Sequence, residues 1–369
     1  MRKEAAQPKT FSEQHPCQRC ATAIVRTFDL TLAYCTPSCV EHNGFAMRYR
    51  RLGRTNFEVS EIGHGAWGIG ANMWFGGSDK ESLAALRASL AAGVNFIDTA
   101  LAYGDEGHSE QLVGEIVRDD PHEVYVATKV PPKNLKWPAV PGVGINEVFP
   151  YDHIIGCTET SLKNLRVETL DLQQLHVWNP EWIDSDIWRR AIEDLKKSGK
   201  VRAFGISIND HQPDSALEIV RTGLIDTVQV IYNIFDQTPE KSLFPLCQEL
   251  NIGVIARVPF DEGALTGRIS EDSTWDPKDF RSMYFRGDRK SQVVERVNGL
   301  LRAMEIHASD LPLVALRFCL SQPAVSTVIP GMRSVSSVEM NVAAPMLGPL
   351  PPVELAIAHE HAWDKNFYS

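Results

Sequence analysis

Four polar side chains stand where apolar, strand-like runs of the sequence end. Asp98 closes one run and Tyr103 follows it, while Lys129 and His176 close the next two runs. A phenol has a pKa of about 10 and is a weak acid at neutral pH, but a neighbouring ammonium group lowers that pKa. Lys129 can supply this charge, and Asp98 can keep Lys129 charged and oriented. His176 can donate a hydrogen bond to a carbonyl oxygen or relay a proton.

The chemistry that suits this set is protonation of an oxyanion while a hydride reaches its carbon. The alternative is purely structural: Asp98 and Lys129 form an ion pair, and His176 is a hydrogen-bonded core histidine. Any one of these residues fits either interpretation, whereas the whole set at corresponding strand ends favours a shared site.

The elements that must position these residues alternate regularly along the chain. Runs rich in β-branched and aromatic residues predict strands, and amphipathic stretches between them predict helices. Strands separated by helices of about ten to fifteen residues are typical of repeated βαβ units, and eight such strands favour a closed (β/α)8 barrel. We predict strands over 61–67, 95–100, 124–130, 170–176, 201–207, 227–233, 253–259 and 325–331, and helices over 79–92, 109–117, 151–165, 184–198, 212–222, 239–250 and 290–306.

The alternative fold is an open, doubly wound sheet, which is expected to carry a Gly-x-Gly-x-x-Gly turn after its first strand. Gly63, Gly65 and Gly68 fit that spacing, but no helical pattern begins there. In a barrel, catalytic groups collect at the carboxyl ends of the strands, which is where the four polar residues fall.

Residues 1–46 differ in composition from the rest, and we predict an N-terminal extension followed by a barrel domain over 47–369. The extension holds one glycine and four of the seven cysteines. These cysteines form two pairs close to the spacing of a four-thiolate zinc site. The pairs are Cys17 with Cys20 and Cys35 with Cys39. The alternative is a disordered tail, or sequence upstream of a protein that starts at Met47.

The composition predicts an ordinary soluble protein. The 369 residues are 43% hydrophobic and 23% charged, with a formal net charge of −10. This acidic balance argues against nucleic acid or an anionic membrane as the main partner. No apolar run approaches the ~20 residues of a membrane-spanning helix, and no signal peptide is recognised. The odd number of cysteines predicts reduced thiols, so we expect a cytoplasmic protein.

Three longer segments, two of which contain Asp98, Tyr103 and His176, carry a further likeness. They are 93–100 followed by Tyr103 and Gly104, 161–165 leading to 170–171 and His176, and 199–202 leading to 205–207. Together they resemble the aldo-keto reductase superfamily, in the family's order, over about residues 47–345. The resemblance implies a barrel that binds NADPH without a Rossmann fold and reduces a small-molecule aldehyde or ketone. By the same resemblance Tyr103 is the general acid, Lys129 and Asp98 tune it, and His176 orients the carbonyl.

Polar residues on later strands are candidates for holding that cofactor. Ser207 and Asn209 end the fifth predicted strand, and Gln229 lies in the sixth. Hydroxyl and amide groups there can bind the carboxamide of nicotinamide. The family usually has Ser followed directly by Asn, whereas Ile208 intervenes here, so which side chain contacts the ring is open. The alternative for Gln229 is an interior residue satisfied within the barrel.

The seventh predicted strand leads to a glycine-containing turn. Many family members have an aromatic residue at the position of Arg257, which stacks on the nicotinamide. A guanidinium group can stack there or pair with the diphosphate, so we expect Arg257 to contact the cofactor. The turn that includes Gly263 and Leu265 can cradle phosphate oxygens with its backbone.

The segment after the eighth predicted strand matches the family's adenosine-phosphate site. The expected residues there are Gly331, Arg333, Ser337 and Asn341. Arg333 and the helix N-terminus behind it favour the 2′-phosphate of NADPH. Gly331 stands where the family usually has a basic residue, so the strength of the preference over NADH is open. The alternative for Arg333 is a solvated arginine at a helix start.

Substrate selection is expected from long loops over 131–150 and 261–290. Trp67 and Trp178 lie beside the predicted site and can form apolar walls, although such residues equally serve as core. The sequence leaves open the physiological substrate and the oligomeric state.

Two other functions are compatible with the sequence. The first is an NADPH-binding barrel that acts as a regulator or sensor with little turnover, because Arg257 and Ile208 depart from the family pattern. The second is a metal-dependent hydrolase. That activity needs several histidines and carboxylates at the strand ends, where we find one of each.

Overall fold

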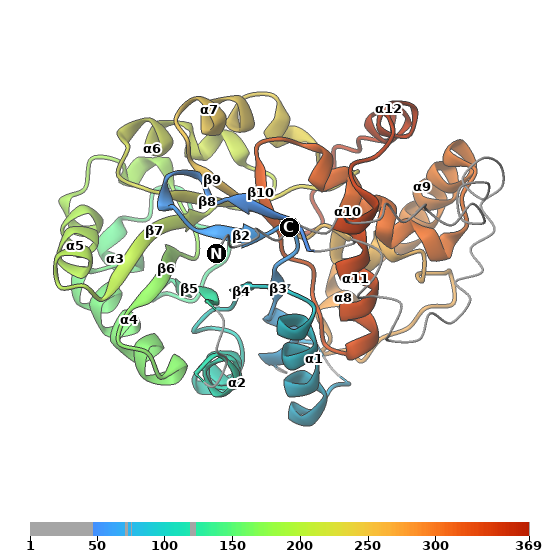
Figure 1. Cartoon of the computed structure of the whole chain (residues 1–369). Coiled ribbons are helices and arrows are strands. Elements are labelled where there is room, and N and C mark those ends of the chain that lie inside the picture. The colour runs from blue at the N-terminus through green and yellow to red at the C-terminus, as the bar shows by residue number, and fades with distance from the viewer. Residues whose placement is uncertain (1–46, 71–72, 75, 119–122, 369) are drawn as a thin grey trace, which may run out of the picture. The chain divides into compact units, whose positions relative to one another are not determined.

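In the described part of the chain, eight parallel strands follow one another in order around a barrel (Figure 1). The computed structural model describes residues 47–368 apart from 71–72, 75 and 119–122. The predicted extension and its cysteine pairs lie outside these residues. Parallel bridges join Ile62 to Val328 and Gly65 to Gly331, so the first strand of the ring meets the last. The strands are β3 (His64–Gly65), β4 (Phe96–Asp98), β5 (Tyr125–Val130), β6 (Leu170–Leu175), β7 (Val201–Ser207), β8 (Thr227–Ile231), β9 (Gly253–Arg257) and β10 (Val325–Val328).

Helices occupy the connections between these strands and surround the barrel (Figure 1). The predicted barrel is therefore confirmed, with each predicted strand and helix present. The helix predicted over 212–222 begins as a 3-10 turn, Pro213–Ala216, before it becomes α-helical. The helices are α1 (Asp79–Ala91), α2 (His108–Val117), α3 (Ile145–Val148), α4 (Tyr151–Leu165), α5 (Asp186–Lys197), α6 (Leu217–Thr222), α7 (Leu243–Glu249), α8 (Phe280–Tyr284), α9 (Arg289–Met304), α10 (Leu311–Ser321), α11 (Val335–Leu347) and α12 (Pro352–Glu360).

The two helices next to the point where the first and last strands of the barrel meet, α1 and α11, each begin at a serine cap. Ser78 caps α1 in a capping box with Glu81, and Ser334 caps α11 in the same way with Ser337. Each cap satisfies amide groups that the first helical turn leaves without a partner. Ser337, predicted as a cofactor residue, therefore has a structural role at the start of α11.

The interior of the barrel is filled in two layers, because strand residues two positions apart share a face. Phe96 at the start of β4 and Ala127 and Ile255 midway along β5 and β9 lie in one buried apolar cluster. Asp98 and Lys129 follow two of them by two positions, so they face the same interior nearer the carboxyl ends. The barrel interior therefore has a polar layer at the carboxyl ends of the strands and an apolar layer on the amino side of it.

A β-hairpin that the sequence did not predict completes the apolar layer. Its strands are β1 (Tyr49–Arg51) and β2 (Glu58–Ser60), which pair antiparallel. Leu52, Phe57 and Val59 are buried in the same cluster as the apolar layer of the barrel. The hairpin therefore closes the amino end of the barrel, opposite the polar layer.

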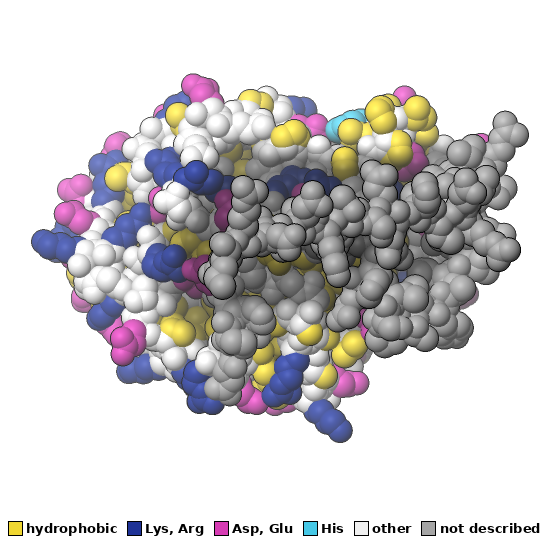
Figure 2. Space-filling view, viewed as in Figure 1, with side chains coloured by type: hydrophobic (Ala, Val, Ile, Leu, Met, Phe, Trp, Pro, Cys, Tyr) yellow, Lys and Arg dark blue, Asp and Glu magenta, His cyan; other side chains and the backbone are white. Residues whose placement is uncertain are grey.

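The surface carries both signs of charge. On the visible face, Lys and Arg side chains are interspersed with Asp and Glu, and apolar side chains gather over α12 (Figure 2). Val353 of α12 is 72% exposed. Among the residues that the structure describes, no helix has the length and apolar character needed to cross a membrane.

Candidate active site

Lys129 is the centre of a buried polar cluster at the carboxyl ends of the strands. Its Nζ donates hydrogen bonds to Asp98 Oδ2 (2.7 Å), Thr99 O (2.7 Å) and Tyr103 Oη (3.2 Å). An ammonium group has three donors, so all of them are used. Lys129 has no exposed surface and Asp98 is 3% exposed. The structure thus brings together three of the four residues that the sequence predicted as catalytic.

The charges of this cluster are set by burial and by the ion pair. Burial opposes the charge on Lys129, but Asp98 and Tyr103 outweigh it and raise the pKa of Lys129 above its usual value. Burial raises the pKa of Tyr103 above 10.0, and the attraction of Lys129 offsets part of that rise. The expected lowering of the Tyr103 pKa is therefore wrong in its net direction, because desolvation outweighs the cation. The result is a phenol that is protonated at neutral pH, as a proton donor must be.

His176 completes the predicted set from the end of β6. Its ring centroid lies 5.6 Å from that of Tyr103, in an edge-on arrangement. Burial, together with the positive charges of Lys129 and Arg257, lowers the pKa of His176 well below 6.5. His176 is therefore a neutral imidazole at pH 7, which has one donor and one acceptor nitrogen. Its Nδ1 is buried without a hydrogen-bond partner.

Two glycines fix the turn that carries Tyr103. Gly104 has a φ of 86°, and a Cβ there would lie 2.5 Å from the carbonyl oxygen of Gly70. A Cβ on Gly70 would in turn lie 2.6 Å from the carbonyl carbon of Tyr103. The two loops can therefore touch only because both residues lack a side chain. Ser109 N also donates to Tyr103 O (3.0 Å), which ties the turn to α2.

The amide residues predicted to bind nicotinamide make different contacts. Gln229 Nε2 donates to Asp98 Oδ1 (2.7 Å), so part of its amide belongs to the catalytic cluster, as the structural alternative supposed. Ser207 is the register neighbour of Gln229 across β7 and β8. Asn209 instead accepts a hydrogen bond from Ala139 N (3.2 Å) and so anchors the loop after β5.

Arg257 ends β9 and is held by the loop that follows β7. Its Nη2 donates to Asp210 Oδ1 (2.6 Å) and to Ile208 O (3.1 Å), while Nε is buried without a partner. Burial alone would lower the pKa of Arg257, but Asp210 reverses that effect and raises it. Its charge acts on both Tyr103 and His176, so Arg257 borders the same site.

The turn after β9, predicted as a phosphate cradle, has part of its backbone engaged in internal hydrogen bonds, and the cradle stays a prediction. It forms the 3-10 segment η8 (Asp261–Thr266). The amides of Gly263 and Leu265 both donate to Phe260 O at 2.9 Å, so these two groups are already satisfied. Asp261 and Glu262 have φ of 48° and 55°, a left-handed backbone that is unusual for residues with side chains.

The segment after β10 provides groups suited to a nucleotide. Arg333 lies against Gly68 and over the Trp74 ring (5.9 Å), and Arg281 lies over the same ring (5.0 Å). Burial and the charge of Arg281 lower the pKa of Arg333. Asn341 is fully buried, and both polar atoms of its amide are without hydrogen-bond partners. An unsatisfied buried amide is costly, so a ligand that pairs with Asn341 would be favoured.

Aromatic side chains surround Tyr103. The Trp67 ring lies 6.2 Å from that of Tyr103 and packs edge-on against Phe280 (5.2 Å). Trp178, predicted to be a substrate wall, has no exposed surface and packs between Trp182 and Trp188. Trp178 is therefore a core residue in this structure, and its contact with substrate stays a prediction.

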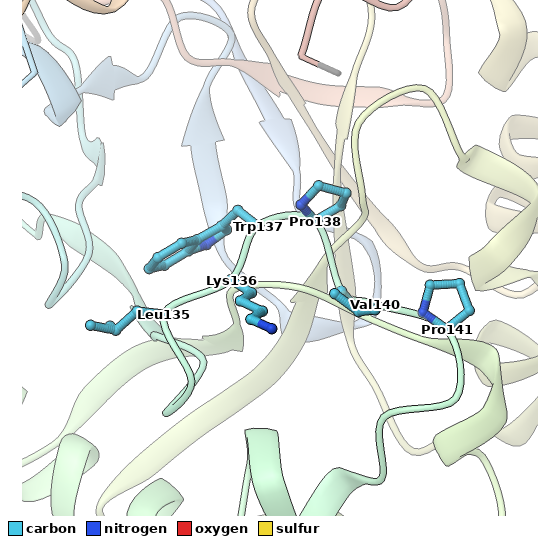
Figure 3. Close-up of a pocket in the computed structure, with 7 residues that line it drawn as sticks. Leu135, Lys136, Trp137, Pro138, Val140 and Pro141 are labelled. Carbon is cyan, nitrogen blue, oxygen red and sulfur yellow. The ribbon is translucent and has the colours of Figure 1, made fainter.

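Trp137 belongs to the loop over 131–150 from which substrate selection is expected, although it was not singled out there as a site residue. It is 44% exposed, and its ring lies edge-on to His176 at 5.7 Å. It belongs to a segment that lines an open pocket of about 500 Å³, where Leu135 and Trp137 project to the same side of the loop (Figure 3). The buried amide of Gln174 was also missed, although it stands two positions before His176 on the same strand face. That spacing of two is the signal that could have identified Gln174.

Comparisons with known proteins agree with this geometry. The model of the Aldo/keto reductase family matches residues 61–362. The aldo-keto reductase YhdN of Bacillus subtilis is 30% identical over 302 residues, which cover 79% of this chain and 87% of the relative. The NADH-specific methylglyoxal reductase of Escherichia coli is 28% identical over 306 residues, which cover 79% and 92%.

Solved structures show the same likeness. The holo form of the aldo-keto reductase AKR11C1 from Bacillus halodurans has a TM-score of 0.67 and 27% identity, with coverage of 86% of this chain and 96% of that one. The glycerol dehydrogenase AKR11B4 from Gluconobacter oxydans has a TM-score of 0.67 and 29% identity, with coverage of 85% and 94%.

Proposed function

Because the chain belongs to the aldo/keto reductase family, we propose that it reduces an aldehyde or ketone to an alcohol with NADPH, with Tyr103 as the proton donor. Membership makes the chain an oxidoreductase that uses a nicotinamide cofactor on small carbonyl compounds, and it sets aside the metal-dependent hydrolase. The observation that carries the finer proposal is the contact of Lys129 Nζ with both Tyr103 Oη and Asp98.

The proposed roles follow from the charges in the cluster. When bound, the reduced nicotinamide supplies the hydride that reaches the carbonyl carbon. The Tyr103 hydroxyl gives its proton to the carbonyl oxygen, and Lys129 stabilises the phenolate that remains. Asp98 keeps Lys129 charged, and Gln229 holds Asp98 from the other side. Neutral His176 donates a hydrogen bond that orients the carbonyl oxygen.

The remaining polar groups fit a nicotinamide nucleotide. Gln229 and Ser207 lie at the catalytic cluster, which is where we propose that the nicotinamide binds. The unpartnered amide of Asn341 and the guanidinium of Arg333 suit the adenosine end and its 2′-phosphate. This charge supports NADPH, although the methylglyoxal reductase relative is named NADH-specific. Direct comparison of the two nucleotides therefore belongs in the first experiment.

The test is Tyr103→Phe, which removes the hydroxyl and keeps the ring. We expect kcat with a reactive aldehyde to fall about 100-fold or more, since general acids contribute on the order of 10²–10⁴. The Kd of NADPH, measured by fluorescence titration, should stay within about twofold because the phenol is proposed to act in chemistry alone.

Tyr49→Phe is the matched control, because its hydroxyl bonds to Gly93 O at the hairpin end of the barrel. An equal loss of NADPH binding and turnover in Tyr103→Phe would contradict the assigned role. Tight NADPH binding by the wild-type protein with no turnover on a panel of aldehydes and ketones would favour the regulatory alternative.

A further inference from the structure

The segment after α12 folds back over η8. Trp363 N donates to Phe235 O (2.8 Å), and Arg289 Nη1 donates to Phe367 O (2.6 Å). Phe367 is buried, and the side chain of Lys365 is 5% exposed. These contacts hold residues 363–368, here called the C-terminal strap, firmly against the barrel.

The C-terminal strap supplies partners for two buried carboxylates of η8. Lys365 Nζ donates to Asp261 Oδ1 (2.8 Å) and to Tyr284 Oη (3.0 Å). The Tyr368 hydroxyl donates to Glu262 Oε1. Asp261 is 1% exposed and Glu262 is 7% exposed, so water contributes little to their solvation. Buried carboxyl groups need hydrogen-bond donors, and the strap provides one for each of these two. Tyr284 Oη adds a second donor to Asp261 Oδ1 (3.0 Å), so Lys365 is the cation of this cluster and not its sole donor.

The strap also continues the aromatic wall of the active site. The Tyr368 ring lies 6.0 Å from Phe280, which packs on Trp67, which in turn faces Tyr103. Tyr368 also lies 5.7 Å from the ring of His211 in the loop after β7. Tyr368 thus touches both the wall of the site and η8, while Lys365 holds only η8 of the two.

The contacts between the strap and η8 affect nucleotide binding if the cofactor passes over η8. This step rests on the proposed function. The nicotinamide belongs at Gln229 on β8, and the adenosine end belongs at Arg333 after β10. A diphosphate that joins the two ends must cross the carboxyl end of β9, where η8 begins. An uncompensated carboxylate at Asp261 would repel that diphosphate across a medium of low polarity.

We propose that Lys365 is a positioning residue for the cofactor: by neutralising Asp261 it makes η8 compatible with the diphosphate and couples docking of the C-terminal strap to nucleotide binding. Lys365 itself acts through Asp261 and does not contact the reacting atoms. The second contact, Tyr368 on Glu262, orders the same turn, whose backbone is left-handed at both acidic residues.

The experiment compares the Kd of NADPH for Lys365→Met, Lys365→Arg and the double variant Asp261→Asn with Lys365→Met. We expect Lys365→Met to weaken NADPH about tenfold, within the usual range of coupling between two sites. Lys365→Arg should restore most of the affinity because it keeps the charge. The double variant should also regain affinity, since a neutral amide in place of the Asp261 carboxylate would need no cation. A merely structural role of the strap is separated by the ligand control, because loss of folded structure would weaken every adenine nucleotide alike.

Adenosine 2′-monophosphate is the ligand control, because it lacks the diphosphate and should bind Lys365→Met as it binds the wild-type protein. Lys290→Met is the protein control, since its ammonium group contacts Ser273 O (3.1 Å). Unchanged NADPH affinity in Lys365→Met would overturn the inference and leave the proposed function intact. So would equal weakening of both nucleotides, or a double variant no better than Lys365→Met. Failure of the wild-type protein to bind NADPH would overturn the proposed function, and the inference with it.

Discussion

Removal of the Lys129 ammonium group should cost more stability than almost any other single charge deletion in the barrel. In Lys129→Met, Asp98 Oδ2 loses its 2.7 Å partner and keeps, on its other oxygen, the bond from Gln229. Asp98 is 3% exposed, so water cannot replace the lost cation. An uncompensated buried charge costs about 3–5 kcal/mol, which is a large part of the roughly 5–15 kcal/mol that stabilises a typical domain.

The assay is urea unfolding at pH 7, followed by circular dichroism, with the free energy taken at a constant slope. The double variant Asp98→Asn with Lys129→Met should recover a large part of the loss, because it removes the unpaired charge. Lys200→Met is the surface control: its partner Glu159 is 38% exposed, and such pairs contribute about 0–1 kcal/mol.

Two results would refute this reasoning. The first is a loss below about 1 kcal/mol in Lys129→Met, which would mean that Asp98 is solvated or already neutral. The second is a double variant whose loss equals the sum of the single losses, which would mean that the two residues are not coupled.

Three further predictions test other parts of the molecule. Burial lowers the pKa of His64 to about 4, below its unfolded value of about 6.5, so stability should fall as the pH drops from 6.5 towards 4. The loss should reach about 3 kcal/mol, and urea unfolding across that range should show a weaker pH dependence in His64→Gln. Arg333→Ala should raise the Kd of NADPH about tenfold or more and leave that of NADH nearly unchanged, as measured by fluorescence titration. Trp137→Ala should raise KM severalfold for aryl aldehydes and little for acetaldehyde, because the exposed ring beside His176 offers an apolar surface; equal effects on both substrates would contradict that role.

The barrel strands were predictable because each is a short, mostly buried apolar run, with exceptions such as the exposed Arg202 of β7. The β1–β2 hairpin was not, since each strand has three residues and charged side chains interrupt the apolar pattern. Its identity as part of the barrel core depends on contacts of Leu52 and Phe57 with strands far along the chain. The periodicity of apolar residues predicts local burial and does not predict contacts between distant segments.

The catalytic cluster could be assembled from the sequence because parallel strands bring their carboxyl ends to one rim. The direction of the pKa shifts inside the cluster could not be predicted from the sequence. Burial decides the direction of the Tyr103 pKa, and burial is a property of the folded chain. The second partner of Asp98, Gln229, is 131 residues away, and the pair of Asp261 with Lys365 spans 104 residues. The order of the strands predicts which residues share a rim, but it does not predict which of their side chains pair.

The hairpin that fills the amino end of the barrel lies opposite the catalytic cluster. Attachment of the protein to a solid support at the hairpin is therefore independent of access to the active site. The hairpin's outward residues Tyr49, Arg51 and Glu58 are exposed, while its inward residues seal the apolar layer. A covalent linker placed at Glu58 would hold the protein on an electrode or bead by the end opposite Tyr103. The immobilised molecule would then present its open rim to the solution, with the catalytic cluster insulated from the support by a layer of packed hydrocarbon.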